Sequence, residues 1–177
     1  MTIPSDTTRS AQSKILDLPG ASTVTPGGRR LGFCTGCFDI LQSGHAVFFE
    51  QCREYCDTLV VIVGRGSNIA GLKPGRPINP DFNRLFLIAA LESVDHVTLG
   101  DRAYTDGKID CVDFCDRYSP AVYVVNDDDS ALEAKRAFCQ TRGIQLQTVT
   151  RTVPEFLSPT STTDIIQKAQ LSSGANG

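Results

Sequence analysis

The chain has 177 residues, 41% of them hydrophobic and 21% charged, as is typical of one globular domain with a sizeable core. Its formal net charge of −3 provides no basic field that would make nucleic acid its main partner. The longest apolar run, LVVIVG at 59–64, is too short to cross a membrane, and residues 1–30 lack the apolar run of a secretory signal. We therefore expect a cytoplasmic enzyme or binding domain.

Strand and helix signals alternate from residue 31 onward. Continuous apolar runs rich in β-branched residues are typical of strands that are covered on both faces, and apolar residues three and four apart are typical of helices. The predicted strands are 31–36, 58–64, 96–100, 121–125 and 144–149. The predicted helices are 44–56, 81–94, 106–118, 130–143, which Gly143 ends, and 161–169, which Ser161 caps.

This alternation predicts an α/β fold, a Rossmann-like doubly wound sheet of five parallel strands with helices on both faces. Residues 64–80 are predicted to form a Gly- and Pro-rich loop, and a loop of that length in a compact domain tends to be functional. We expect one domain over residues 29–170, a flexible N-terminal segment over 1–28 and a disordered tail over 171–177.

The chain contains seven Cys residues and only two His residues. Without a secretory signal a disulfide scaffold is not expected. Cys34 and Cys37 form a C-x-x-C pair, but no second such pair completes a metal site. We favour packing in the core, where Cys behaves as a small hydrophobic residue, and keep a metal or redox module as the alternative.

The segment TGCFDILQSGH, residues 35–45, links the first predicted strand to the first predicted helix. It lies at the carboxyl end of a strand, where α/β sheets bind ligands. Gly36 and Gly44 let the main chain approach a ligand closely, and a helix start favours anions. His45 could then donate a hydrogen bond, or bring a positive charge, to a phosphate oxygen. A His that only caps the strand end with a main-chain contact is the alternative.

Four segments together, TGCFDILQSGH, LVVIVG, LKPGRPINP and STTDII, resemble the cytidylyltransferase-like nucleotidyltransferases. Those carry a GxFDxxHxGH signature, a KGxRPI loop before an Arg-bearing helix, and a late STT helix start. The resemblance covers roughly residues 31–169. It is greatest to the nucleotidyltransferase domain that makes ADP-heptose from heptose 1-phosphate, and glycerol-3-phosphate and ethanolamine-phosphate cytidylyltransferases are its neighbours.

The resemblance implies transfer of a nucleotidyl group from ATP or CTP to a small phosphorylated acceptor, most simply a sugar phosphate. The acceptor oxygen attacks the α-phosphorus and pyrophosphate leaves. Catalysis of this kind consists of positioning and charge neutralisation. Mg²⁺ that bridges phosphate oxygens is implied as the cofactor, with no residue assigned as a dedicated metal ligand, and the family suggests a homodimer.

The resemblance also implies site residues. His45 matches the second His of the signature, which contacts the α- and β-phosphates, and it is expected to be catalytic together with Gln42 and Lys73. The implied acceptor residues are Asp39, Arg76 and Arg84, although the Asp of this family more often braces the turn than it contacts substrate, and Arg76 could face the ligand or brace the loop. The implied nucleotide-binding residues are Gly36, Cys37, Phe38 and Gly44 through their main chain, Asn126 and Asp127 near the base, and Ser161, Thr162 and Thr163 around the β- and γ-phosphates.

Simpler explanations stand beside several of these assignments. Lys73 and Arg76 lie in the predicted loop, where an exposed charge is usually only solvated. Ser161 is explained by N-capping alone. The acids at 127–129 suit the start of a helix, where they complement the helix dipole.

Two positions depart from the family pattern. Gln42 replaces the first His of HxGH, and a Gln amide can donate a hydrogen bond but carries no charge. The string NDDD at 126–129 replaces a Gly-rich KGGDY-like string. The site is therefore active with a neutral donor, adapted to another acceptor such as a phosphonate or an alcohol phosphate, or degenerate and limited to binding nucleotide or sugar phosphate.

Overall fold

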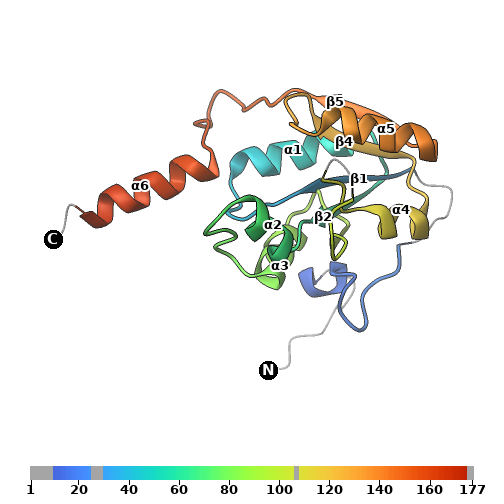
Figure 1. Ribbon diagram of the computed structural model, residues 1–177, viewed down its shortest axis with the longest axis horizontal. Coiled ribbons are helices and arrows are strands. Elements are labelled where there is room, and N and C mark those ends of the chain that lie inside the picture. The colour runs from blue at the N-terminus through green and yellow to red at the C-terminus, as the bar shows by residue number, and fades with distance from the viewer. Residues whose placement is uncertain (1–9, 25–29, 106–107, 175–177) are drawn as a thin grey trace.

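The computed structural model describes residues 10–24, 30–105 and 108–174, and its centre is a five-stranded sheet (Figure 1). Every strand pairing is parallel, and the strand order is β3-β2-β1-β4-β5. The predicted Rossmann-like sheet is therefore confirmed. The strands are β1 (Leu31–Gly36), β2 (Thr58–Val63), β3 (His96–Leu99), β4 (Val122–Asn126) and β5 (Gln145–Val149).

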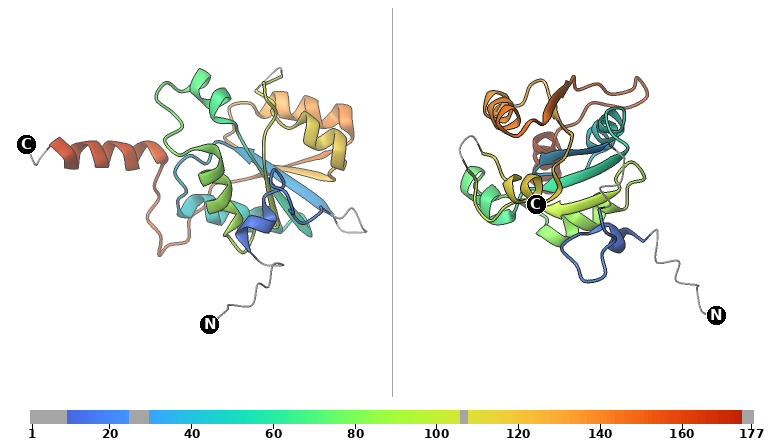
Figure 2. Two further views of the ribbon diagram at one scale, coloured as in Figure 1. Left: turned by 90° about the horizontal axis from the view of Figure 1, so that it is seen from below. Right: turned by 90° about the vertical axis from the view of Figure 1, so that its right-hand side faces the viewer.

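Helices cover both faces of this sheet (Figure 2). One face packs against α1 and α3, and the other against α4 and α5. Successive strand residues alternate between the two layers, as the pleat requires: Cys34 and Val61 belong to the first, Phe33 and Val60 to the second. The helices are a 3₁₀ turn η1 (Ala11–Lys14), α1 (Ser43–Arg53), α2 (Gly66–Leu72), α3 (Asp81–Ala89), α4 (Val112–Tyr118), α5 (Leu132–Arg142) and α6 (Thr162–Gly174).

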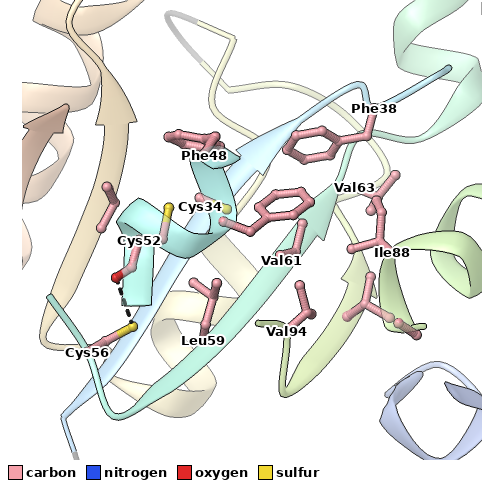
Figure 3. Close-up of a cluster of buried hydrophobic side chains, with 14 of the residues drawn as sticks. Cys34, Phe38, Phe48, Cys52, Cys56, Leu59, Val61, Val63, Ile88 and Val94 are labelled. Atoms are coloured by element: carbon pink, nitrogen blue, oxygen red, sulfur yellow. Dashed lines mark hydrogen bonds between the residues drawn. The ribbon is translucent and has the colours of Figure 1, made fainter. Parts of the chain in front are cut away.

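The first layer is shown in Figure 3, where Phe38 and the α1 residues Phe48 and Cys52 pack over β1 and β2. Six of the seven Cys residues are buried, and all seven are free thiols. The prediction that Cys packs as a small apolar residue is confirmed for those six, and Cys37 is half-buried.

The predicted loop over 64–80 is wrong in part, because α2 forms within it. Two tertiary contacts hold this short helix. The Asp81 carboxylate accepts a hydrogen bond from the Gly66 main-chain N–H at 2.9 Å, and Ile69 is buried in the core. A segment with a single buried residue and two Gly residues carries no helical periodicity, which explains the missed helix.

Two predicted helices are shorter than expected, and remote side chains explain both boundaries. α3 ends at Ala89 rather than at residue 94, and the Lys14 ammonium binds the main-chain carbonyls of Leu91 and Val94 beyond it. α4 begins only at Val112, where the Asp101 carboxylate accepts a hydrogen bond from the Val112 N–H at 2.7 Å. Residues 106–107 of that predicted helix lie outside the described residues.

Residues 10–24 and α6 lie at the two ends of the described chain. Within the predicted flexible segment 1–28, residues 10–24 pack on the domain: Ile15 forms a bridge with Val97 of β3, and both Ile15 and Val24 are buried. α6 continues to Gly174, past the predicted boundary at residue 170. Gly143, by contrast, ends α5 in the left-handed conformation, as predicted.

Candidate active site

The carboxyl ends of β1 and β4 form the crevice in which a doubly wound sheet binds its ligands. β1 and β4 are neighbours in the sheet, and the chain turns to opposite faces after them, toward α1 and α5. Such a switch point leaves the strand ends open between two helix starts. The turn that follows β1, residues 37–42, lies there together with the N-terminus of α1.

Gln42 and His45 hold each other at the start of α1. The Gln42 side-chain oxygen accepts a hydrogen bond from the Gly44 N–H at 3.0 Å, and the Gln42 N–H donates to Nδ1 of His45 at 3.3 Å. This reciprocal arrangement is a capping box. It gives Gln42 a structural role that needs no charge.

The same contact fixes the proton of His45. Because Nδ1 accepts a hydrogen bond, a neutral ring carries its proton on Nε2. Burial, together with the nearby positive charge of Arg151, lowers the pKa of His45 to about 4. In the free protein at neutral pH, His45 is therefore a neutral Nε2–H donor rather than the cation that the sequence left open.

Gly36, Cys37 and Phe38 shape the turn between β1 and α1. Phe38 adopts a left-handed backbone conformation with φ of 43°, which a bulky residue seldom adopts. Its ring folds back over Gly36, where an added Cβ would lie 2.6 Å from the ring. The ring also meets the His45 ring edge-on, with 5.3 Å between centroids. Phe38 is therefore a buried support for the His45 ring, and only its main chain can face a ligand.

Asp39 and Arg76 clamp the loop before α3 onto this turn. The Asp39 carboxylate is buried, forms an ion pair with Arg76 at 2.6 Å, and accepts hydrogen bonds from the N–H groups of Ile78 and Asn79. The pKa of Asp39 lies below its usual value: burial opposes this, but those two N–H groups and Arg76 outweigh it. In this structure Asp39 and Arg76 therefore hold the loop in position, and their implied contact with the acceptor stays a prediction.

Arg84 is similarly occupied by the protein. Its side chain is fully buried and donates to the carbonyls of Cys37 at 2.6 Å and Gly64 at 2.8 Å, and it pairs with Asp81 at 2.7 Å. Arg84 therefore ties the ends of β1 and β2 to α3, and its implied contact with the acceptor stays a prediction.

The remaining predicted residues lie around the crevice. Lys73 is exposed directly after α2. The Asn126 side-chain oxygen is buried at the end of β4 without a hydrogen-bond partner among the described residues, as expected of a group that awaits a ligand. Asp127 accepts a hydrogen bond from the Thr150 hydroxyl at 2.6 Å, which links the loop after β4 to the segment after β5.

Ser161, Thr162 and Thr163 do not join the turn in this structure. Ser161 and Asp164 form the expected capping box, with the Asp164 N–H donating to Ser161 Oγ at 3.1 Å. From there α6 points away from the sheet (Figures 1 and 2). None of its residues whose side chains are described is buried.

Two groups near the crevice escaped the sequence reasoning. The Nε–H of Arg151 is shared between the two carboxylate oxygens of Asp128, at 2.8 and 2.9 Å, and the Arg151 charge lies close enough to His45 to lower the pKa of that ring. Asp110 is buried beside Gly64 and Gly100, at the ends of β2 and β3. Neither belongs to a local motif, although the RT dipeptide at 151–152, directly after a predicted strand, offered a signal for Arg151.

In residues 10–24, 30–105 and 108–174, no group of three or more His, Cys, Asp or Glu side chains is arranged to hold a metal ion. No helix in the same residues is long and apolar enough to cross a membrane.

Comparison with protein families decides the family of this chain. The family model described as cytidylyltransferase-like matches residues 33–168, which includes the turn, the clamped loop and the start of α6. The chain belongs to the cytidylyltransferase-like family.

Relatives within this family agree with that assignment. The chain is similar to the bifunctional protein HldE of Alcanivorax borkumensis, with 33% identity over 143 residues, which cover 80% of this chain and 28% of that protein. HldE of Nitratiruptor sp. is 44% identical over 73 residues, 41% of this chain and 16% of that protein. The chain therefore spans less than a third of the length of these curated relatives.

A solved structure shows the same architecture. The lipopolysaccharide core biosynthesis protein of Thermoplasma volcanium superposes with a TM-score of 0.58 and 29% identity, over 72% of this chain and 100% of that one.

Proposed function

We propose that this protein is a nucleotidyltransferase that couples ATP or CTP to a phosphorylated small molecule, most simply a sugar phosphate, and releases pyrophosphate. The observation that carries the proposal is the His45 ring, held by Gln42 at the start of α1 with a neutral Nε2–H donor, at the switch point of a cytidylyltransferase-like sheet. Membership in that family supplies the class of reaction.

In the proposed reaction an oxygen of the acceptor phosphate forms a bond to the α-phosphorus of the nucleotide. The bond from that phosphorus to the bridging oxygen of the β-phosphate breaks, and pyrophosphate takes the electron pair. The Nε2–H of His45 donates to a phosphate oxygen at which negative charge develops, and the N-terminus of α1 adds its dipole. Arg151 and Lys73 supply positive charge from the segment after β5 and from the end of α2.

Mg²⁺ is the proposed cofactor, and when bound it would neutralise charge on the triphosphate. The described residues would contribute few ligands of their own, so we assign none to the ion. The expected homodimer also remains a proposal, and sedimentation equilibrium of the full chain measures it directly.

The capping role of Gln42 supports an active site over a degenerate one. A Gln in place of the first signature His still completes the capping box and still orients His45. The substitution therefore leaves the donor geometry intact. A protein that only binds nucleotide or sugar phosphate remains the alternative, and so does a cytidylyltransferase for a phosphonate or an alcohol phosphate.

Pyrophosphate release tests the proposal. The full chain is mixed with Mg²⁺, one of ATP or CTP, and one of glucose 1-phosphate, mannose 1-phosphate, glycerol 3-phosphate or phosphoethanolamine. We expect release with at least one pair in wild type and a loss of about 100-fold or more in His45→Ala. Nucleotide binding by calorimetry without pyrophosphate from any pair would favour the binding protein instead.

A further inference from the structure

A cavity lies near the carboxyl ends of β2 and β3, and the proposed reaction does not account for it. It has a volume of about 540 Å³ and lies between α4, the end of β3 and residues 16–23 of the N-terminal segment. Arg65, Arg102 and Arg117 line it together with four carboxylates. A ligand here meets hydrogen-bond donors and acceptors on neighbouring walls.

Two of the four lining acids already have structural partners. Asp17 accepts hydrogen bonds from the Thr98 hydroxyl and the Leu99 N–H, and Asp101 accepts from the N–H groups at the start of α4. Asp113 is exposed at the outer wall. These three therefore have no need of a ligand.

Asp110 differs from them. Its side chain is only 6% exposed, and within the described residues the hydrogen-bond donor to its carboxylate is its own main-chain N–H. The Lys135 ammonium, whose charge acts on Asp110, is bound to Asp129 at 2.8 Å. An ionised carboxylate buried in this way costs free energy unless a ligand supplies donors. Asp110 lines the cavity, so the donors can come from there.

The cavity adjoins the nucleotide turn. An added Cβ at Gly64 would lie 3.4 Å from the Asp110 carboxylate and 3.7 Å from the Gly36 carbonyl, so only the small residue Gly64 separates the two. The Asp110 carboxylate of the cavity and the Gly36 carbonyl of the turn therefore lie on either side of Gly64.

The chemistry of the walls selects a class of ligand. A phosphate group does not suit a pocket with a buried carboxylate, and the described residues offer no three-ligand metal site. A sugar hydroxyl donates to a carboxylate and accepts from a guanidinium, so a polyhydroxylated carbon chain satisfies both kinds of group.

We propose that this cavity binds the hydroxylated carbon chain of the acceptor, with Asp110 accepting hydrogen bonds from its hydroxyl groups while the acceptor phosphate lies toward His45. The site rests on the proposed function for the identity of the ligand as an acceptor. It adds a specificity-determining residue, Asp110, and it selects sugar or polyol phosphates over phosphoethanolamine.

The variant Asp110→Asn tests the site, because it keeps the size of the side chain and removes the charge. We expect the KM for the best sugar phosphate to rise at least 10-fold, while the KM for the nucleotide changes less than 2-fold. Asp116→Asn is the matched control, since it removes the same charge from α4 at a residue outside the cavity. An unchanged acceptor KM in Asp110→Asn would overturn the proposal.

A second variant, Ala21→Phe, tests the cavity independently in case Asp110→Asn folds poorly. Ala21→Phe fills the cavity from the half-exposed N-terminal segment without a change in any buried charge, and it should also raise the acceptor KM. Preference of the wild type for phosphoethanolamine over every hydroxylated acceptor would contradict the ligand class.

Calorimetry separates this inference from the proposed function. Suppose that the wild type releases no pyrophosphate but binds mannose 1-phosphate, and that Asp110→Asn weakens that binding at least 10-fold. The acceptor cavity is then supported and the nucleotidyltransferase reaction is not. If Asp110→Asn and Ala21→Phe both release pyrophosphate with full activity, the nucleotidyltransferase reaction is supported and the acceptor cavity is contradicted.

Discussion

At the scale of single residues, the pair Gln42 and His45 determines what the crevice can do. A capping box usually satisfies main-chain donors at a helix start, but here one of its two acceptors is the imidazole ring. The ring thereby gains a fixed tautomer and a fixed direction. A neutral donor near a triphosphate costs less desolvation than a buried cation, and this fits the low pKa of His45.

We expect His45→Ala to reduce turnover by about 100-fold or more and to change the free energy of unfolding by less than about 1 kcal/mol. The ring is only half-buried, and its hydrogen bond to Gln42 is a modest structural contact. Pyrophosphate release and urea denaturation measure the two quantities. Equal turnover in variant and wild type would contradict the role of His45.

The buried Asp110 carboxylate should make the free energy of unfolding depend on pH. Burial raises the pKa of Asp110 to about 6, and the Asp101 carboxylate acts in the same direction. The folded state thus binds its proton more tightly than the unfolded chain, so Asp110 lowers stability progressively as the pH rises from about 4 to 6. We expect Asp110→Asn to gain about 2–3 kcal/mol over wild type between pH 4 and pH 8 in urea denaturation. If the difference in the free energy of unfolding between Asp110→Asn and wild type did not change with pH, burial would not destabilise the Asp110 carboxylate.

At the scale of elements, the Arg84 guanidinium joins three parts of the chain. It contacts the turn after β1 through Cys37, the end of β2 through Gly64, and the start of α3 through Asp81. We expect Arg84→Met to lower the free energy of unfolding by about 3–5 kcal/mol, because buried acceptors lose a charged donor. Arg76→Met should lower the free energy of unfolding by less, because the Arg76 side chain is partly exposed. Equal losses in the two variants, measured by urea denaturation, would argue against Arg84 as the central contact.

α6 behaves as an element that is separate from the core. None of its described side chains is buried, so ending the chain after residue 160 should leave the free energy of unfolding within about 0.5 kcal/mol of wild type. The same truncation should raise the nucleotide KM about 10-fold if the STT start binds phosphate oxygens during turnover. Ser161→Ala, which removes only the cap, is the milder control. An unchanged nucleotide KM would remove α6 from the site.

At the scale of the whole molecule, binding at the sheet edge should stabilise the entire domain, since the crevice joins β1, β4, α1 and the clamped loop. A ligand at 100 times its Kd adds about 2.7 kcal/mol to the folded state. We expect ATP or CTP with Mg²⁺ to raise Tm by several degrees, and GTP and UTP to raise it less. Equal increases in Tm with all four nucleotides would show that the protein does not distinguish their bases.

The sequence by itself determined the order of strands and helices, the parallel sheet, the turn with His45 and the Gly143 stop. Each of these rests on local periodicity, on backbone preference or on a motif of adjacent residues, so neighbours along the chain carry the information. Tertiary structure decided the rest. It placed α2 in a predicted loop, packed residues 10–24 on the edge of the sheet, and paired Asp39 with Arg76 and Asp81 with Arg84. It also brought Asp110 to the ends of β2 and β3 and Arg151 near His45. These outcomes depend on which charges meet across the fold, and a buried charge takes its role from those partners rather than from its place in the sequence.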